Sequence, residues 1–184
     1  MRKQGFLNKL FREGKIQIVE PSAQVQEAYR KKSESYLVSA KILLENERLE
    51  ETVSMAYYSM YYMVLALLFK TGIKCENHSG AMILLESLYG IDNCRIAAAK
   101  RDRIDKQYYV DFAITAEEVR ESIQEAEGFY ADLYDFMERL HQGEISRLRE
   151  EAVQLLDDTS SPDLYFAPLR CAYPVRCSSS SNLW

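Results

Sequence analysis

Cations and tyrosines are interleaved in one short segment of this chain, and this is its pattern with the most chemical potential. The segment reads Lys100-Arg-Asp-Arg-Ile-Asp-Lys106, and Tyr108 and Tyr109 follow directly. A guanidinium can bind phosphate through two parallel hydrogen bonds, and a tyrosine ring can stack on a base. The same segment is also typical of a solvated surface on which each Arg pairs with a neighbouring Asp. Residue types alone leave both interpretations open.

Four further tyrosines form two pairs that are one helical turn apart: Tyr57, Tyr58, Tyr61 and Tyr62. On a helix, Tyr57 and Tyr61 share one face, while Tyr58 and Tyr62 share the neighbouring face. The flanking residues are apolar or small, which favours a core in which each ring packs and each hydroxyl finds a partner. The alternative is a surface on which nucleobases stack.

Patterns typical of nucleophiles and metal sites are scarce. Neither histidine, His78 or His141, lies in a recognised nucleophile motif. Cys75 and His78 have the spacing of two metal ligands, but no second pair completes a tetrahedral site. The sequence has no glycine-rich phosphate loop of the P-loop or dinucleotide type. We therefore expect neither a metal nor a cofactor.

The elements that must position these residues are predicted to be helices. Apolar residues recur at helical spacing from the candidate N-cap Ser22 to about Asn46. The next helix ends before Gly72 and is apolar on nearly all sides, which predicts a central place in a bundle. Shorter helices are expected over residues 79–89 and from residue 92 to about 100.

The second half of the chain predicts two more helices. Thr115-Ala-Glu-Glu118 is a capping-box pattern, and apolar residues three and four apart follow it to Leu140. Gln142-Gly143 is expected to break this register, and a second helix is expected to start near Ile145. These patterns predict an all-α, up-and-down bundle of four to five helices.

The bundle is expected to occupy residues 22–158. Residues 1–21 would form a leader that packs on the bundle or precedes it. Residues 159–184, which contain Pro, Cys and a run of Ser without helical period, would form an irregular, flexible tail.

Bulk properties restrict the function classes. A formal net charge of −5 argues against indiscriminate binding of duplex nucleic acid, which needs many cations. The N-terminus lacks the apolar run of a signal peptide, and serines and tyrosines interrupt the longest apolar stretch. The four cysteines have no paired spacing and are read as reduced thiols. We expect a cytoplasmic protein without a membrane partner.

The succession of motifs from about Ala28 to Leu140 resembles the HEPN domain (higher eukaryotes and prokaryotes nucleotide-binding). It looks closest to the stand-alone archaeal and bacterial subfamily of uncharacterised small HEPN proteins. The matching features are Ala56-Tyr-Tyr-Ser-Met-Tyr-Tyr62, Gly72 with His78-Ser-Gly80, the Arg103 segment ending in Tyr109-x-Asp111, and a last helix with Ala126 and Phe129.

The resemblance implies a helical bundle that often forms a homodimer. Many HEPN proteins are metal-independent ribonucleases with an Arg-x(4–6)-His motif, two copies of which meet across the dimer. In toxin–antitoxin pairs, a small MNT-type nucleotidyltransferase silences the ribonuclease. Other members bind nucleotides or RNA without cleavage.

This chain departs from the ribonuclease motif. Four residues separate Arg103 from Tyr108, and this tyrosine occupies the position where the motif has histidine. A phenol titrates at about 10 and is a poor general base at neutral pH. We therefore expect binding of a nucleotide, RNA or a nucleotidyltransferase rather than cleavage. The alternatives are a divergent ribonuclease that uses Arg103 with Tyr108 or His78, and a purely structural interaction module. The ligand-binding or dimer-groove candidates are Arg101, Arg103, Lys106, Tyr108, Tyr109, Asp111 and His78.

Overall fold

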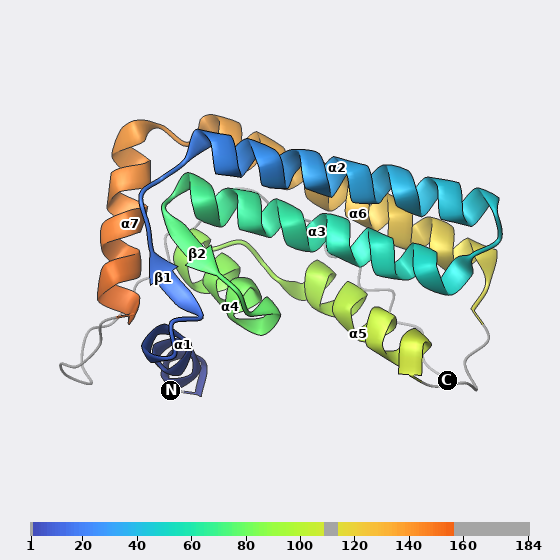
Figure 1. Cartoon of the computed structure of the whole chain (residues 1–184), viewed down its shortest axis with the longest axis horizontal. Helices are drawn as coiled ribbons and strands as arrows, with labels where there is room; N and C mark the ends of the chain where they lie inside the picture. The colour runs from blue at the N-terminus through green and yellow to red at the C-terminus, as the bar shows by residue number, and fades with distance from the viewer. Residues whose placement is uncertain (1, 109–113, 157–184) are drawn as a thin grey trace.

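The computed structural model describes residues 2–108 and 114–156, and these ranges are mainly helical (Figure 1). The helices are α1 (Arg2–Arg12), α2 (Ala23–Glu45), α3 (Leu49–Lys70), α4 (His78–Tyr89), α5 (Cys94–Tyr108), α6 (Ala116–Arg139) and α7 (Gln142–Leu156). Two short strands, β1 (Ile16–Ile18) and β2 (Ile73–Cys75), pair in antiparallel register with Ile16 opposite Cys75. The predicted all-α helical bundle is confirmed.

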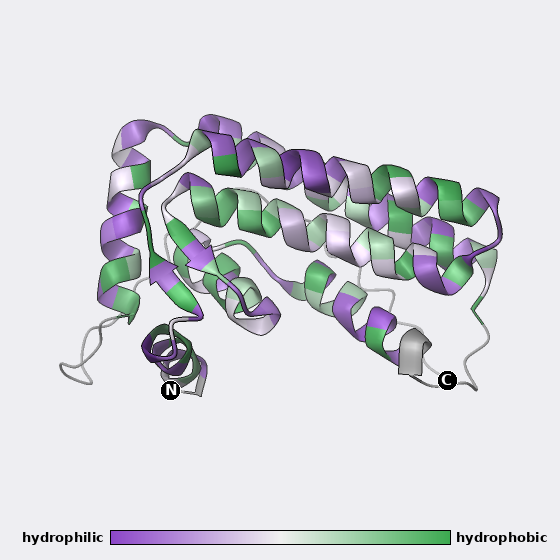
Figure 2. Cartoon of the chain, viewed as in Figure 1, coloured by the Kyte–Doolittle hydropathy of each residue, from purple (hydrophilic) through white to green (hydrophobic). Residues whose placement is uncertain are grey.

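Helix α3 is the centre of the molecule. It contacts α2, α4, α5, α6 and β2, and Figure 1 shows it between α2 and α5 with α6 behind. Most of its side chains are buried, and Figure 2 shows it as largely hydrophobic or neutral. Glu50 and Glu51 occupy its first turn, where the helix dipole favours negative charge. The central position predicted for this helix is confirmed.

The composition of α3 would also suit a membrane span. Within the described part of the chain, it is the one helix long and apolar enough to cross a bilayer. However, 72% of its apolar window is buried inside the protein. Because the core helix of a globular domain passes the same test, the packing of α3 already accounts for its apolar character.

Helices α2 and α3 pack closely because small side chains lie between them. The Ser33 hydroxyl donates to the Ser59 carbonyl oxygen at 2.7 Å, and both residues are fully buried. Helix α2 starts as predicted, since the Ser22 hydroxyl accepts from the Val25 N–H at 3.2 Å. Together these contacts fix the relative register of two helices that each contribute tyrosines to one cluster of aromatic rings.

Helix α6 covers α3 on a third side and is tied to α5. Its predicted capping box is confirmed: the Thr115 hydroxyl accepts from the Glu118 N–H, and the Glu118 carboxylate accepts from the Thr115 N–H at 2.8 Å. Arg95 of α5 bonds Glu125 at 2.9 Å and Asp132 at 2.6 Å, both on α6. The buried residues of α6 are Val119, Ile123, Ala126, Phe129, Leu133 and Met137.

A smaller cluster of α1, the two strands, α4 and α7 closes one end of the bundle (Figure 1). Gly80 of α4 lies so close to Leu10 of α1 that a Cβ there would meet the Leu10 side chain at 2.7 Å. Gly72, with φ +77°, turns the chain from α3 into β2. Arg149 of α7 donates to the Val19 carbonyl, which joins α7 to the segment after β1.

The structure corrects the sequence prediction at three places. Helix α5 continues to Tyr108 instead of ending near residue 100, because three consecutive alanines and the charged residues after them are good helix formers. Helix α7 begins at Gln142 and contains Gly143, since Glu144 bonds the His141 N–H at 3.0 Å and stabilises the first turn. Strand β2 was not predicted, because its partner β1 is distant in sequence.

Candidate functional site

Arg103 of α5 lies against the tyrosine-rich face of α3. Its guanidinium carbon is 4.9 Å from the ring centre of Tyr58 and 5.6 Å from that of Tyr57, which is cation–π range. Its Nε is buried and has no hydrogen-bond partner among the described residues. A buried donor of this kind is costly to leave unsatisfied, which marks Arg103 as a candidate binding residue.

His78 is held rigidly beside the same tyrosines. It is the first residue of α4, which Asn77 caps by accepting from the Gly80 N–H at 2.8 Å. The imidazole lies flat on the Tyr61 ring, with centres 3.8 Å apart and an angle of 7° between planes. A hydrogen bond of 2.5 Å joins its Nδ1 to the Tyr57 hydroxyl. These contacts fix the orientation of the imidazole.

The electrostatics of this group favour neutral aromatic side chains. Burial, then Lys100 and Arg103, lower the pKa of His78 below its ordinary value, so the ring is neutral at pH 7. Burial raises the pKa of Tyr57 to about 12, although the charge of Arg103 acts in the opposite direction. Tyr57 therefore remains a hydroxyl and acts as a hydrogen-bonding group, not as a base.

Lys100 completes the cluster. It lies one helical turn before Arg103 on α5, and its ammonium donates to the Ser79 hydroxyl at 2.8 Å. Burial, followed by the charge of Arg103, lowers the pKa of Lys100. Neither cation forms an ion pair with a residue that the structure describes, whereas Arg95 and Arg149 each bond a carboxylate. The arrangement has the two cations and the aromatic lining of a candidate anion site.

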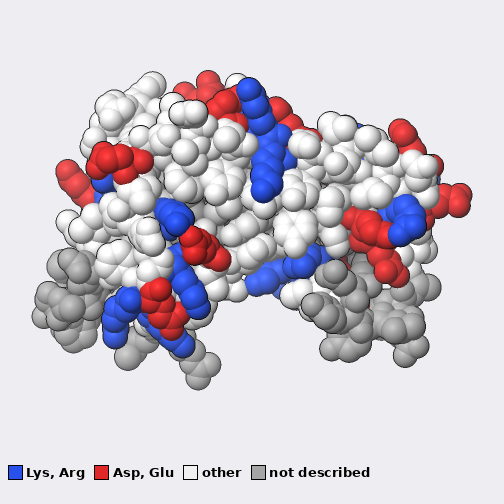
Figure 3. Space-filling model, viewed as in Figure 1, with Lys and Arg blue, Asp and Glu red and all other residues white. Residues whose placement is uncertain are grey.

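A row of tyrosine rings extends from this cluster between α2 and α3. Tyr36 lies 5.6 Å from Tyr58 and 5.1 Å from Tyr62, and Tyr29 lies 5.9 Å from Tyr62. The Lys32 ammonium lies 4.2 Å from the Tyr62 ring centre. Figure 3, viewed as in Figure 1, shows Lys and Arg atoms at the middle of this side of the molecule and at both of its ends, and acidic atoms mainly toward the ends and the upper edge.

The structure brings together some of the predicted site residues and separates others. Arg103 and His78 share the site. Arg101 is exposed and, two positions from Arg103, lies on a different face of α5, so its prediction as a site residue is not supported by this arrangement. Lys106 and Tyr108 belong to the last turns of α5, but their side chains lie outside the described residues, as do Tyr109 and Asp111 altogether.

Sequence reasoning missed the roles of Lys100 and of the α3 tyrosines in this site. Tyr57 and Tyr61 are 0% and 6% exposed, which confirms that they are core residues, yet both touch His78. The i, i+3 spacing of Lys100 and Arg103 could have indicated that both side chains lie on one face of a helix. It depends on the segment being helical, which the sequence analysis did not predict.

Metal binding finds little support in the part of the chain that the structure describes. No group of three His, Cys, Asp or Glu side chains there is arranged to hold an ion. The Cys75 thiol donates to the Asn77 carbonyl at 3.3 Å, and burial raises its pKa to about 11. A protonated, engaged thiol is a poor metal ligand.

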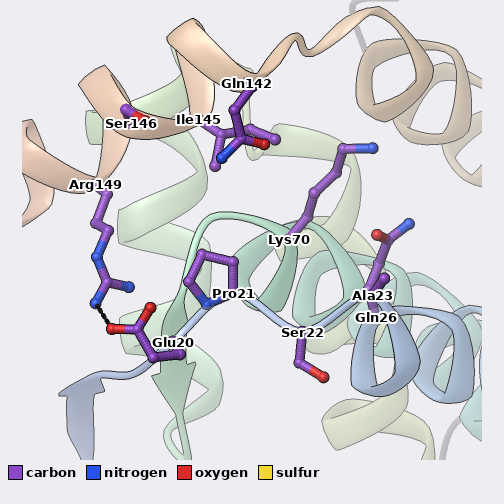
Figure 4. Close-up of a pocket in the computed structure, with 10 residues that line it drawn as sticks. All are labelled: Glu20, Pro21, Ser22, Ala23, Gln26, Lys70, Gln142, Ile145, Ser146 and Arg149. Carbon is purple, nitrogen blue, oxygen red and sulfur yellow. Dashed lines mark hydrogen bonds and ion pairs between the residues drawn. The ribbon is translucent and has the colours of Figure 1, made fainter.

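A cleft of about 560 Å³ opens at another place, between the start of α2, the end of α3 and α7 (Figure 4). Its Arg149 is bonded to Glu20 at 2.8 Å and to the Val19 carbonyl. Lys70 and Gln142 extend over the cleft in Figure 4. Because its guanidinium is already paired and no aromatic ring lines it, this cleft fits a nucleotide less well than the Arg103 cluster does.

Comparison with known families decides the identity of the bundle. The HEPN domain model matches residues 26–140, more than half of the chain. The chain belongs to the HEPN family. The matched range of this HEPN protein contains most of α2 and all of α3 to α6, and therefore His78, Lys100, Arg103 and the tyrosine row.

Two curated proteins are similar to part of this HEPN chain. A UPF0332 protein of Thermotoga maritima is 39% identical over 59 residues, which is 32% of this chain and 45% of that protein. A UPF0332 protein of Pyrococcus horikoshii is 45% identical over 56 residues, or 30% of this chain and 39% of that protein. The matched region spans less than half the length of each relative.

Proposed function

We propose that this HEPN protein binds a nucleotide or RNA, with a phosphate held by Arg103 and Lys100. The observation that carries the proposal is a pair of half-buried cations that no described carboxylate neutralises, one of which has a buried, unpartnered Nε. A phosphate supplies both negative charge and several hydrogen-bond acceptors. It would satisfy the Arg103 nitrogen and offset the repulsion between the two cations.

The aromatic surroundings favour a nucleotide over a simple anion. Arg103 lies against Tyr58, which is half-buried and whose ring contacts that of Tyr36. A base can stack on such a ring while its phosphate reaches the guanidinium. A site for inorganic phosphate alone would not require these rings.

The test is fluorescence anisotropy of a labelled single-stranded RNA in competition with nucleotides. Arg103→Ala should weaken binding by about tenfold or more, because a charged hydrogen-bonded contact is lost, and should reduce the salt dependence of binding. Arg101→Ala removes the same charge from an exposed position of the same helix and is the matched control. Equal effects of the two substitutions, or no effect of Arg103→Ala, would remove Arg103 from the site.

A second candidate function is a metal-independent ribonuclease that uses His78 in place of the histidine missing from the motif. It is favoured by the position of His78, which is neutral at pH 7 and shares Tyr57 with Arg103. A neutral imidazole can accept the proton of a 2′-hydroxyl, and a guanidinium can stabilise the charge that develops on phosphate.

RNA cleavage in the presence of EDTA distinguishes the two functions. For a ribonuclease, wild type and Arg101→Ala should cleave structured RNA, whereas Arg103→Ala and His78→Gln should not. If the wild-type protein binds RNA and leaves it intact over hours, the binding function stands and the ribonuclease does not.

A homodimer and a small nucleotidyltransferase partner are further proposals from membership of the HEPN family. Light scattering after gel filtration measures the oligomeric state, and co-purification with a nucleotidyltransferase encoded beside this gene tests the partner. A monomer that binds neither nucleic acid nor such a partner would instead support a purely structural interaction module.

A further inference from the structure

The positive charge around Arg103 is larger than one internal phosphate of a nucleic-acid strand can neutralise. Lys100 and Arg103 lie one turn apart on the same face of α5, and both are half-buried. Within the ranges that the structure describes, neither of them is ion-paired. An internal phosphodiester carries a single negative charge, so it would leave one of these two cations without a counter-charge.

The N-terminus of α4 adds a third electropositive group. His78 and Ser79 are the first two residues of α4, and the Ser79 hydroxyl accepts from the Lys100 ammonium at 2.8 Å. Asn77 accepts from the next two N–H groups of the helix. The N–H groups of His78 and Ser79 come before these and have no carbonyl partner within the helix. The helix dipole therefore favours an anion at the place where Lys100 meets α4.

The acidic side chains near the cluster are engaged elsewhere or lie on other faces. Glu76 and Glu86 each pair with a lysine outside the cluster, at 2.6 Å and 2.9 Å. Asp102 and Asp105 are exposed and lie one and two positions from Arg103, so they belong to other faces of α5. Among the described residues, the charge of the cluster therefore stays without a carboxylate.

The pKa shifts agree with this excess of positive charge. Burial lowers the pKa of Lys100, and the charge of Arg103 lowers it further. After burial, the same two cations also lower the pKa of His78. A bound anion would oppose the electrostatic part of these shifts, and two negative charges would do so more strongly than one.

We infer that the cluster selects a terminal phosphate, the phosphomonoester of a mononucleotide or of a strand end, over the internal phosphodiesters of a strand. A phosphomonoester carries a charge of about −1.5 to −2 at pH 7 and three acceptor oxygens. Arg103 and Lys100 each bind one of these oxygens, and the first N–H groups of α4 face the third. The inference rests on the proposed function and extends it, because it names the chemical form of phosphate that the site takes.

The test compares ligands that differ by one negative charge. Competition against an octauridylate with a 5′-phosphate and a 3′-fluorescein label is followed by anisotropy on the full chain. The competitors are UMP, its methyl ester on the phosphate, and tetrauridylates with a 5′-phosphate, a 3′-phosphate or hydroxyls at both ends. UMP should compete about tenfold better than its methyl ester, because a charged hydrogen bond is lost.

The tetramers show where the phosphate comes from. If the site takes a strand end, one of the phosphate-ended tetramers should also compete about tenfold better than the hydroxyl-ended tetramer. If the site takes a mononucleotide, UMP alone should show the preference. A preference of less than threefold in both comparisons would overturn the inference.

Substitutions on α5 locate the preference. Lys100→Met keeps the apolar stem and removes one cation, so the ratio of UMP to methyl-ester affinity should fall below threefold. Arg101→Met removes an exposed charge from the adjacent position, on another face of the helix, and should keep the wild-type ratio. A wild-type ratio in Lys100→Met would remove Lys100 from the phosphate site. Circular dichroism confirms that both variants are folded.

Amide resonances give a readout that needs no variant. In the ¹⁵N-labelled wild-type protein, saturating UMP should shift the amide signals of His78 and Ser79 more than the saturating methyl ester does. The signals of α7, which lines the separate cleft of Figure 4, should stay in place. Shifts confined to α7 and the start of α2 would place the phosphate in that cleft and overturn the inference.

The outcomes separate this inference from the proposed function. If Arg103→Ala weakens all ligands while the methyl ester binds like UMP, the nucleotide site stands and the selection of a terminal phosphate is wrong. If the wild-type protein binds none of the ligands, both proposals fall.

Discussion

Arg103 is placed so that its charge acts on His78. The Arg103 guanidinium faces two tyrosine rings, one of which also bonds His78. The fixed positive charge nearby, added to burial, keeps the imidazole neutral. A neutral imidazole and an unpartnered guanidinium nitrogen are together suited to a phosphodiester, because one accepts a proton and the other binds an oxyanion.

The lowered pKa of His78 predicts how stability responds to acid. In the unfolded chain His78 titrates at about 6.5, whereas in the folded protein it does so at lower pH. Between these two values the unfolded state binds more protons, so the free energy of unfolding should fall as the pH drops below 6.5. Urea unfolding at pH 7.0, 6.0 and 5.5 should show this loss in wild type.

The His78→Gln variant supplies the control for that measurement. It cannot take up the proton, so its stability should change less than that of wild type over the same pH range. If both proteins lose the same free energy between pH 7.0 and 5.5, His78 is not the group responsible.

At the scale of elements, α5 and the turn after α3 determine whether the site forms. Helix α5 places Lys100 and Arg103 on one face and Arg101 on another, and Arg95 anchors that helix to α6. The turn at Gly72 leads α3 into β2 and then to Asn77, which caps the helix that carries His78. A change in this turn should therefore displace the imidazole as well as reduce stability.

Gly72 and Gly90 form a matched pair for testing that turn. Both have positive φ, +77° and +66°, so alanine at either should cost about 1–2 kcal/mol from the left-handed conformation alone. At Gly90 an added Cβ meets nothing within 4 Å, whereas at Gly72 it would lie 2.5 Å from the Val19 carbonyl oxygen. Gly72→Ala should therefore lower the free energy of unfolding clearly more than Gly90→Ala in urea titrations. Equal losses would mean that the Val19 segment moves aside freely.

At the scale of the whole molecule, the four-helix part formed by α2, α3, α5 and α6 is joined to a smaller cluster of α1, the strands, α4 and α7. Helix α3 contacts both parts. Arg149 of α7 binds the segment that joins β1 to α2, because it donates to the Val19 carbonyl and to Glu20. His78 belongs to the smaller cluster and Arg103 to the larger one. The site therefore lies where the two parts meet.

This arrangement predicts that loss of the Arg149 hydrogen bonds increases amide hydrogen exchange only locally. Arg149→Met keeps most of the side-chain length and removes the donors, so amide hydrogen exchange should increase in β1, β2 and α7 but not in the middle of α3 and α6. Arg147→Met, which removes only an exposed i, i+4 pair with Glu151 on the same helix, should change little. Uniformly faster exchange in Arg149→Met would show that the two parts unfold as one unit.

The sequence alone determined most of the fold. Apolar periodicity and capping residues predicted α2, α3, α4 and α6. The residues that form the buried face and the ends of a helix lie within about twenty contiguous positions, so a local sequence pattern is enough to find them. Ser22 and the Thr115–Glu118 box were predicted as caps and act as caps. The HEPN family was also readable from the order of the motifs. The strands were not, since each depends on a partner distant in sequence. The length of α5 was underestimated, although its residues are good helix formers.

For the candidate site, the sequence identified Arg103 and His78 as candidates but did not show which residues lie near His78. The tertiary structure decided that these residues, 25 positions apart, meet on the tyrosines of α3, and that Arg101 does not join them. It also divided the four tyrosines of one repeated motif into two that are buried and two that are only half-buried. Helical spacing fixes which side chains share a face, but only the packing of α2, α4 and α5 around α3 decides which face is covered.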